Sequence, residues 1–167
     1  MKTWLIGDTH FLHGNIIKYC DRPIDNWMRI EAAWQELVNP RDLVIHLGDV
    51  CMGASVEVEK WYDKVFSHLP GDKLLVKGNH DHRSYGYFRE RGWQVVVESL
   101  VMKAYKKKIV FSHEPLNMSE WPKCEVNVHA HIHNLWPRGK QISAQHKLYC
   151  IEYEDYKPVD LEEFMAR

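Results

Sequence analysis

Two short pairs of polar residues have the spacing of paired metal ligands. Asp8 and His10 stand two positions apart, as do His131 and His133, and in an extended chain this spacing points both side chains of a pair the same way. A carboxylate can bridge two cations, and a neutral imidazole is a ligand for Zn²⁺, Fe²⁺, Ni²⁺ or Mn²⁺. Either pair alone is a weak signal, because such short patterns often arise by chance.

The segment Gly78-Asn79-His80-Asp81 is more specific. Directly after an apolar run it offers an amide oxygen as a ligand, an imidazole, and a carboxylate that can orient the imidazole. A helix cap is the alternative, with Asn79 or Asp81 starting a helix near Tyr85. A cap accounts for one of these residues but not for the whole set.

Four segments of one pattern position these side chains. Each is a short apolar run followed by a small residue and then a polar residue, as expected for strands buried on both faces. Polar groups where such strands end lie at the carboxyl edge of a sheet, where open α/β sheets form their sites. The runs are residues 3–7 before Asp8, 43–48 before Asp49, 74–78 before Asn79 and 109–112 before His113.

Helices are predicted between these strands. One begins at Asp25 or Asn26 and runs to Val38, a second begins at Ser55 and runs to Leu69, and a short third lies between Tyr85 and Gly92. Further strands are expected at 94–97, 100–105, 107–111 and 126–129, a hairpin at 141–144 and 148–153, and a last helical turn at 160–164. This order predicts an α/β fold, a layered sandwich with two mixed central sheets flanked by helices.

The bulk composition predicts a single domain over residues 1–167. Hydrophobic residues make up 45% of the chain, enough for a sizeable core, and the formal net charge of -1 argues against strong non-specific binding to nucleic acid. No signal-peptide core or membrane-length apolar run is present. The 4 cysteines form no C-x-x-C pair, so we expect free thiols in a cytoplasmic protein.

Five motifs in order resemble the calcineurin-like metallophosphoesterase superfamily. They are Asp8-Thr9-His10, Gly48-Asp49, Gly78-Asn79-His80-Asp81, Ser112-His113-Glu114-Pro115 and His131-Ile132-His133. The stretch from Asp8 to Pro23 also resembles a compact single-domain subgroup found in bacteria and their phages. One departure is Ala130, which stands where the family commonly has glycine. The added methyl group argues against a tight backbone turn at this position, but it does not affect the ligand residues.

The resemblance implies two divalent metal ions, Mn²⁺ first, with Fe²⁺, Ni²⁺ or Zn²⁺ as alternatives. One ion would be held by Asp8, His10, Asp49 and His133, and the other by Asp49, Asn79, His113 and His131. His80 would contact the phosphate and protonate the leaving oxygen, and Asp81 would orient His80.

The implied activity is hydrolysis of a phosphate ester, with a phosphodiester favoured over a monoester. A metal-bridged hydroxide would attack phosphorus in line. A nuclease or a 2',3'-cyclic nucleotide phosphodiesterase is an alternative, as is a catalytically inactive scaffold on the same fold. Nucleic acid is expected only as a substrate and no membrane is expected as a partner, and the oligomeric state stays open.

Several residues have open assignments. His13 contacts the substrate phosphate or caps a short helix at 15–20, Arg22 binds phosphate or pairs with Asp21 or Asp25, and Asn79 can touch substrate as well as metal. Among the other histidines, His46 is expected in the core and His129 in the interior or behind the ligands, with His68, His82 and His146 on the surface.

Overall fold

The structure is a computed structural model that describes all 167 residues. A five-stranded sheet has the order β4-β3-β2-β1-β9, in which β1 to β4 run parallel and β9 antiparallel. Leu5 of β1 pairs with Ile45 of β2, which in turn pairs with Leu74 of β3. The bounds are β1 (Thr3–Ile6), β2 (Leu43–His46), β3 (Asp72–Val76), β4 (Val95–Val97) and β9 (Val159–Asp160).

A second sheet of four strands has the order β5-β6-β7-β8. The strands are β5 (Ser99–Ala104), β6 (Lys107–Ser112), β7 (Val126–His129) and β8 (His146–Leu148). β5 and β6 form an antiparallel hairpin, whereas β6, β7 and β8 are parallel. Leu5 and Leu75 of the first sheet and Phe111 and Val128 of the second belong to one buried core. The predicted fold with two mixed sheets is confirmed.

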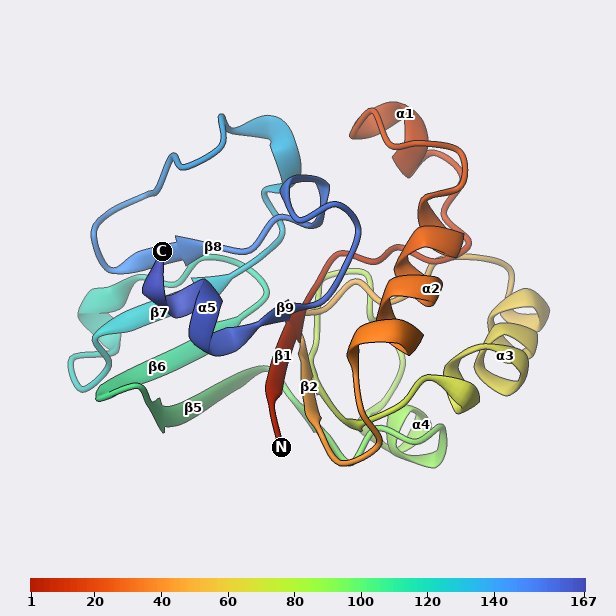
Figure 1. Cartoon of the computed structure of the whole chain (residues 1–167), viewed down its shortest axis with the longest axis horizontal. Coiled ribbons are helices and arrows are strands. Elements are labelled where there is room, and N and C mark those ends of the chain that lie inside the picture. Colours follow the sequence, from red (N-terminus) through yellow and green to blue (C-terminus); the bar gives the residue numbers. More distant parts are fainter.

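Three helices cover the five-stranded sheet on the right of Figure 1: α2 (Asn26–Leu37), α3 (Ser55–Lys64) and α4 (Tyr85–Glu90). α2 buries Ile30 and Trp34, spaced four residues apart on one face. Two further helices are α1 (Ile16–Tyr19) and α5 (Leu161–Ala166), and the Asp160 carboxylate caps α5 by accepting the N–H of Glu162 at 2.9 Å. No helix has the length and apolar character needed to cross a membrane.

The predicted hairpin at 141–144 and 148–153 is wrong. β8 is shorter and pairs in parallel with β7, and residues 151–153 form a 3-10 turn, η4 (Ile151–Tyr153). Residues 141–144 alternate polar and apolar side chains, but Ile142 is 43% exposed and the segment forms no strand. Instead the Gln141 side chain accepts the N–H of Leu148 at 3.0 Å. The second helix also ends earlier than predicted, at Lys64, and a separate turn η1 (Phe66–His68) follows it.

Candidate metal centre

The ends of five strands bring the predicted ligands together. Asp8 follows β1, Asp49 follows β2 and Asn79 follows β3, while His113 and His131 follow β6 and β7. The backbone N–H of Asp8 donates to Gly48 O at 3.0 Å, which holds two of these ends in register. Because β1 to β3 are parallel neighbours, their carboxyl ends meet at one edge, as the sequence predicted.

Backbone strain is concentrated at this edge. Five predicted ligands have positive φ although none is glycine: Asp8 (50°), His10 (46°), Asp49 (56°), His131 (68°) and His133 (53°). Left-handed conformations are costly for such residues and cluster at functional sites, where the surrounding structure holds them. Five of the eleven non-glycine residues with positive φ are thus predicted ligands, which adds to the signal of their chemistry.

The potential ligand atoms form two groups that meet at Asp49. Those of Asp8, His10 and His133 lie within 4.8 Å of one another, and so do those of Asp49, His113 and His131. Asp49 Oδ2 lies 3.5 Å from His10 Nε2 of the first group and 3.4 Å from His113 Nε2 of the second. One carboxylate oxygen thus faces both groups, which is the geometry a bridging ligand requires.

The donor chemistry fits cations. His113 Nδ1 donates to Leu47 O at 2.7 Å, so the neutral ring presents a lone pair at Nε2. That lone pair faces Asn79 Oδ1 at 2.8 Å and Asp49 Oδ2 at 3.4 Å, although all three atoms are acceptors. A cation placed among them would satisfy all three.

Buried atoms without partners support the same fit. Asp8 Oδ1 and both ring nitrogens of His10 are buried and lack hydrogen-bond partners. Burial raises the pKa of Asp8 and lowers that of His10, so the low-dielectric interior disfavours the charged form of each side chain. The neutral imidazole of His10 is the form that binds metals.

Two glycines allow the strand ends to pack this closely. A Cβ on Gly78 would lie 2.2 Å from Asp49 Oδ1, and one on Gly48 would lie 2.4 Å from Gly78 N. Gly48 also has a φ of +92°, a backbone conformation that residues with a side chain rarely adopt. The glycines before Asp49 and Asn79 are therefore required by the approach of one backbone to the other.

Asp81 does not have the predicted partner. Its carboxylate makes no hydrogen bond to the His80 ring; Oδ2 accepts the N–H groups of Asp49 and Gly78, each at 2.8 Å, and Oδ1 accepts that of Val50 at 3.1 Å. The side chain is buried between the loops after β2 and β3, where backbone donors surround it. Burial raises the pKa of Asp81 to about 6, against the opposing effect of these bonds. Asp81 therefore fixes the backbone of the loop that carries Asp49.

Two imidazoles, those of His13 and His80, lie beside the predicted ligand His10. The His10 ring centroid lies 5.3 Å from that of His13 and 5.7 Å from that of His80, and both neighbours are half-buried. The His80 N–H donates to Asp49 Oδ1 at 2.9 Å, which fixes the backbone of His80 to the central carboxylate. The structure therefore places the rings of His13 and His80 next to the predicted ligand His10.

Arg22 lies inside the protein, not at the predicted phosphate position. Its side chain is 0% exposed, and its guanidinium donates to the carbonyls of Asp8 at 2.8 Å and Thr9 at 3.2 Å. It pairs with Glu152 at 2.7 Å rather than with Asp21 or Asp25. The arginine is thus a support for the loop that carries Asp8.

Sequence reasoning missed Glu152. The same oxygen that binds Arg22 lies 3.0 Å from His133 Nδ1, so the carboxylate can fix the tautomer that leaves Nε2 free as a ligand. Although burial opposes it, the hydrogen bond from His133 and the charge of Arg22 lower the pKa of Glu152 to about 2. Glu152 falls in the stretch 148–153 that the sequence predicted as a strand, so no sequence signal marked it for this role.

Four of the remaining histidines follow the predictions and one does not. His68 and His82 are exposed, as predicted. His46 and His129 are each 1% exposed, which confirms that both are interior residues. His146, predicted on the surface, is only 9% exposed, because its ring bonds Leu116 O at 2.9 Å and Ser143 Oγ at 2.8 Å. These two contacts draw the residue at the start of β8 into the structure.

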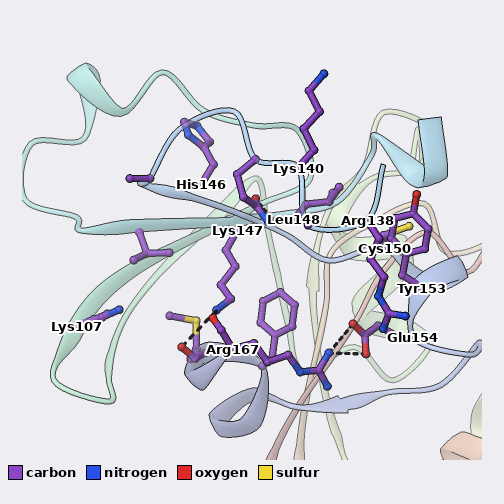
Figure 2. Close-up of a pocket in the computed structure, with 16 residues that line it drawn as sticks. Lys107, Arg138, Lys140, His146, Lys147, Leu148, Cys150, Tyr153, Glu154 and Arg167 are labelled. Atoms are coloured by element: carbon purple, nitrogen blue, oxygen red, sulfur yellow. Dashed lines mark hydrogen bonds and ion pairs between the residues drawn. The ribbon is translucent and has the colours of Figure 1, made fainter. Parts of the chain in front are cut away.

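A cavity of about 570 Å³ contains none of the predicted site residues. Figure 2 shows Arg167 paired with the Glu154 carboxylate, and Lys147 bonded to main-chain oxygens. Lys107 lies at the lower left of this view and Lys140 near its top. We call this cavity the basic groove, after its five cationic residues Lys107, Arg138, Lys140, Lys147 and Arg167, against Glu154 as its one acidic residue.

The fold and the clustered Asp and His ligands define a metallophosphoesterase, and comparison with known proteins agrees. Residues 1–161 match the calcineurin-like phosphoesterase family, and the chain belongs to this family. The resemblance predicted from the five motifs is thereby confirmed. Membership supports hydrolysis of phosphate esters with divalent metals.

Two relatives are similar to this chain in sequence, and one solved structure is similar to it in fold. The uncharacterized protein MJ1445 of Methanocaldococcus jannaschii is 30% identical over 176 residues, covering 96% of this chain and 88% of that protein. The gene 66 protein of Mycobacterium phage D29 is 29% identical over 93 residues, 53% of this chain and 44% of that protein. The crystal structure of AQ665 from Aquifex aeolicus, a protein of unknown function, has a TM-score of 0.80 at 23% identity, covering 99% of this chain and 98% of that one. This last likeness shows a shared fold.

Proposed function

We propose that the protein is a phosphodiesterase that uses two divalent cations sharing Asp49. The observation that carries this proposal is the position of Asp49 Oδ2, which lies 3.5 Å from His10 Nε2 and 3.4 Å from His113 Nε2. Asp8, His10 and His133 would complete one cation site, and Asn79, His113 and His131 the other. Mn²⁺ is the proposed ion, because a mixed set of carboxylate, amide and imidazole ligands suits it; Fe²⁺, Ni²⁺ and Zn²⁺ are the competitors.

Two bound cations would lower the pKa of a coordinated water and neutralise charge on the phosphoryl oxygens. The chain itself supplies the proton donor: the His80 imidazole protonates the leaving oxygen, and its backbone bond to Asp49 sets its position. His13 offers a second ring to the phosphate. Asp81 keeps the Asp49 loop in place by accepting the N–H groups of Asp49 and Val50, and it ties this loop to the next by accepting that of Gly78.

No protein nucleophile is needed for this reaction. The thiol of Cys51 lines the cavity that His80 borders, but burial, together with Asp81 and Glu59, raises its pKa to about 12. A thiol is a poor nucleophile in its protonated form. Direct attack by water on phosphorus, without a phospho-enzyme, is therefore the proposed route.

The test is hydrolysis of bis(p-nitrophenyl) phosphate by the Mn²⁺-loaded chain, with and without a chelator. We expect turnover that the chelator abolishes and that Asp49→Ala lacks. The inactive scaffold alternative predicts no metal-dependent turnover in the wild type, and that result would overturn the proposal. A p-nitrophenyl monoester assayed alongside measures the preference for diesters.

A nuclease is the second candidate, and the basic groove favours it. The chain as a whole is nearly neutral, yet the groove carries five cationic residues and one acidic residue. Such a surface attracts a nucleic-acid backbone, with an affinity that falls as salt rises. The double variant Lys107→Glu/Lys140→Glu should weaken binding of a single-stranded oligonucleotide and flatten its salt dependence, whereas Lys60→Glu on α3 should not. Equal affinities for all three proteins would exclude this role of the groove.

A further inference from the structure

A cavity of about 450 Å³ adjoins His80 on the side of α3 and α4. Met52, from the loop after β2, and Val58 of α3 line it, as do Tyr87 of α4 and His80. Its volume lies within the range of about 300–1,000 Å³ typical of small-molecule sites. We call it the His80 pocket. It is separate from the basic groove, with which it shares no residue.

The His80 pocket begins where a leaving group would depart. The His80 ring lies 5.7 Å from His10, a proposed metal ligand, and 6.2 Å from His82, which also lines the pocket. A general acid must reach the oxygen that it protonates, at about 2.6–3.2 Å. The group attached to that oxygen therefore lies on the His80 side of the phosphorus, next to this cavity.

The walls of the pocket suit a flat, partly apolar group. Met52, Val58 and Tyr87 are each half-buried and leave apolar surface toward the cavity. The Tyr87 hydroxyl donates to Glu59 at 2.8 Å, which fixes the ring. Aromatic and apolar walls with a few polar groups, here His80, Asp81, His82 and Arg83, are typical of small-molecule sites.

Arg83 is the hydrogen-bond donor at one end of the His80 pocket. Its guanidinium lies 5.3 Å from the centre of the Tyr87 ring and donates one hydrogen bond, to Ser55 Oγ at 2.7 Å. No carboxylate pairs with it, so most of its five donors are free for a ligand. Guanidinium groups hydrogen-bond to acceptor atoms on base edges and stack on planar rings.

We propose that the His80 pocket binds the nucleoside part of the leaving group, so that the substrate is a nucleoside phosphodiester. The base lies against the apolar walls with Arg83 at its acceptor edge, and the sugar oxygen points to His80. This inference rests on the proposed function for the role of His80. The pocket itself is a property of the metal-free chain, and it can be tested there.

The experiment titrates adenosine into the metal-free protein and follows binding by NMR. Met52→Trp fills the pocket and should weaken binding at least tenfold, and Arg83→Ala should weaken it several-fold. Met28→Trp is the matched control, because Met28 is 67% exposed on α2 and does not line the pocket. Val58→Trp is a second filling variant, used if thermal unfolding shows that Met52→Trp does not fold.

Adenosine should also inhibit bis(p-nitrophenyl) phosphate hydrolysis competitively in the Mn²⁺-loaded wild type, and at least tenfold more weakly after Met52→Trp. Absence of adenosine binding, or equal binding by wild type and both filling variants, would overturn the inference. Turnover without adenosine binding would reject the pocket and keep the phosphodiesterase. Adenosine binding without turnover in wild type would keep the pocket as a nucleoside site and reject the proposed function.

Discussion

Arg22 and Glu152 form an ion pair in the interior, 130 residues apart in sequence and 2.7 Å apart in space. Their side chains are 0% and 3% exposed, and the pair lies between two proposed ligands. Arg22 holds the Asp8 carbonyl, and Glu152 holds the His133 ring. Both residues are therefore positioning residues for the first cation site.

Glu152→Gln should weaken metal binding and lower stability. It keeps the shape of the side chain but leaves Arg22 as an unpaired buried charge, which costs about 3–5 kcal/mol. Losing a charged partner behind a ligand histidine typically weakens metal affinity about 10–100-fold. Calorimetric Mn²⁺ titration and urea unfolding of the metal-free protein measure the two effects.

Asp25→Asn is the control for this change. It removes the exposed pair with Arg29, whose side chain is 53% exposed, and should cost less than about 1 kcal/mol. Unchanged Mn²⁺ affinity in Glu152→Gln would mean that Glu152 does not position His133.

Asp49→Ala should lose both cations together. Its carboxylate faces both ligand groups, so its removal takes an oxygen from each. Metal analysis after dialysis should fall from about two ions per chain to fewer than one. Retention of one tightly bound ion would show that Asp49 serves only one site.

His80→Ala should separate catalysis from metal binding. The ring is proposed to protonate the leaving oxygen, a role worth about 10²–10⁴-fold in rate. Diesters with alkyl leaving groups should lose most of this factor, and p-nitrophenyl esters much less, because p-nitrophenolate leaves without a proton. The metal content should not change; loss of metal in this variant would show that His80 is a ligand instead.

His46 should make stability depend on pH. The Thr9 hydroxyl donates its hydrogen to Val50 O, so it accepts a hydrogen bond from His46 Nε2. The other ring nitrogen, His46 Nδ1, accepts the N–H of Gly48. The buried ring therefore has both hydrogen bonds only when it is neutral. Burial lowers the pKa of His46 to about 3. Between pH 6.5 and 3, His46 binds a proton in the unfolded chain but not in the folded chain. The free energy of unfolding therefore falls as the pH falls, by about 1.4 kcal/mol per pH unit.

Urea unfolding of the metal-free protein from pH 7 to pH 4.5 measures this slope. Other buried groups add to the wild-type curve, so the comparison is with His46→Gln, which cannot titrate. The gap between the two proteins should narrow steadily below pH 6.5. Parallel curves would mean that His46 takes up a proton as readily in the folded state as in the unfolded chain.

The sequence predicted the site residues that directly follow strands. It did not predict the residues that hold the site in place through contacts between distant segments. Asp8, Asp49 and Asn79 each stand after an apolar run, and parallel strands bring such positions to one edge. Glu152 lies in the turn η4, where the sequence predicted a strand, and nothing local reveals its pairing with Arg22. The partners of Asp81 depend on how two loops pack, which no short motif encodes.

Anomalous scattering from a crystal of the Mn²⁺-loaded protein tests the central claim most directly. The account predicts two peaks of comparable height on either side of Asp49, one beside His10 and His133 and the other beside His113 and His131. A single peak, or none at these residues, would contradict a shared two-cation site.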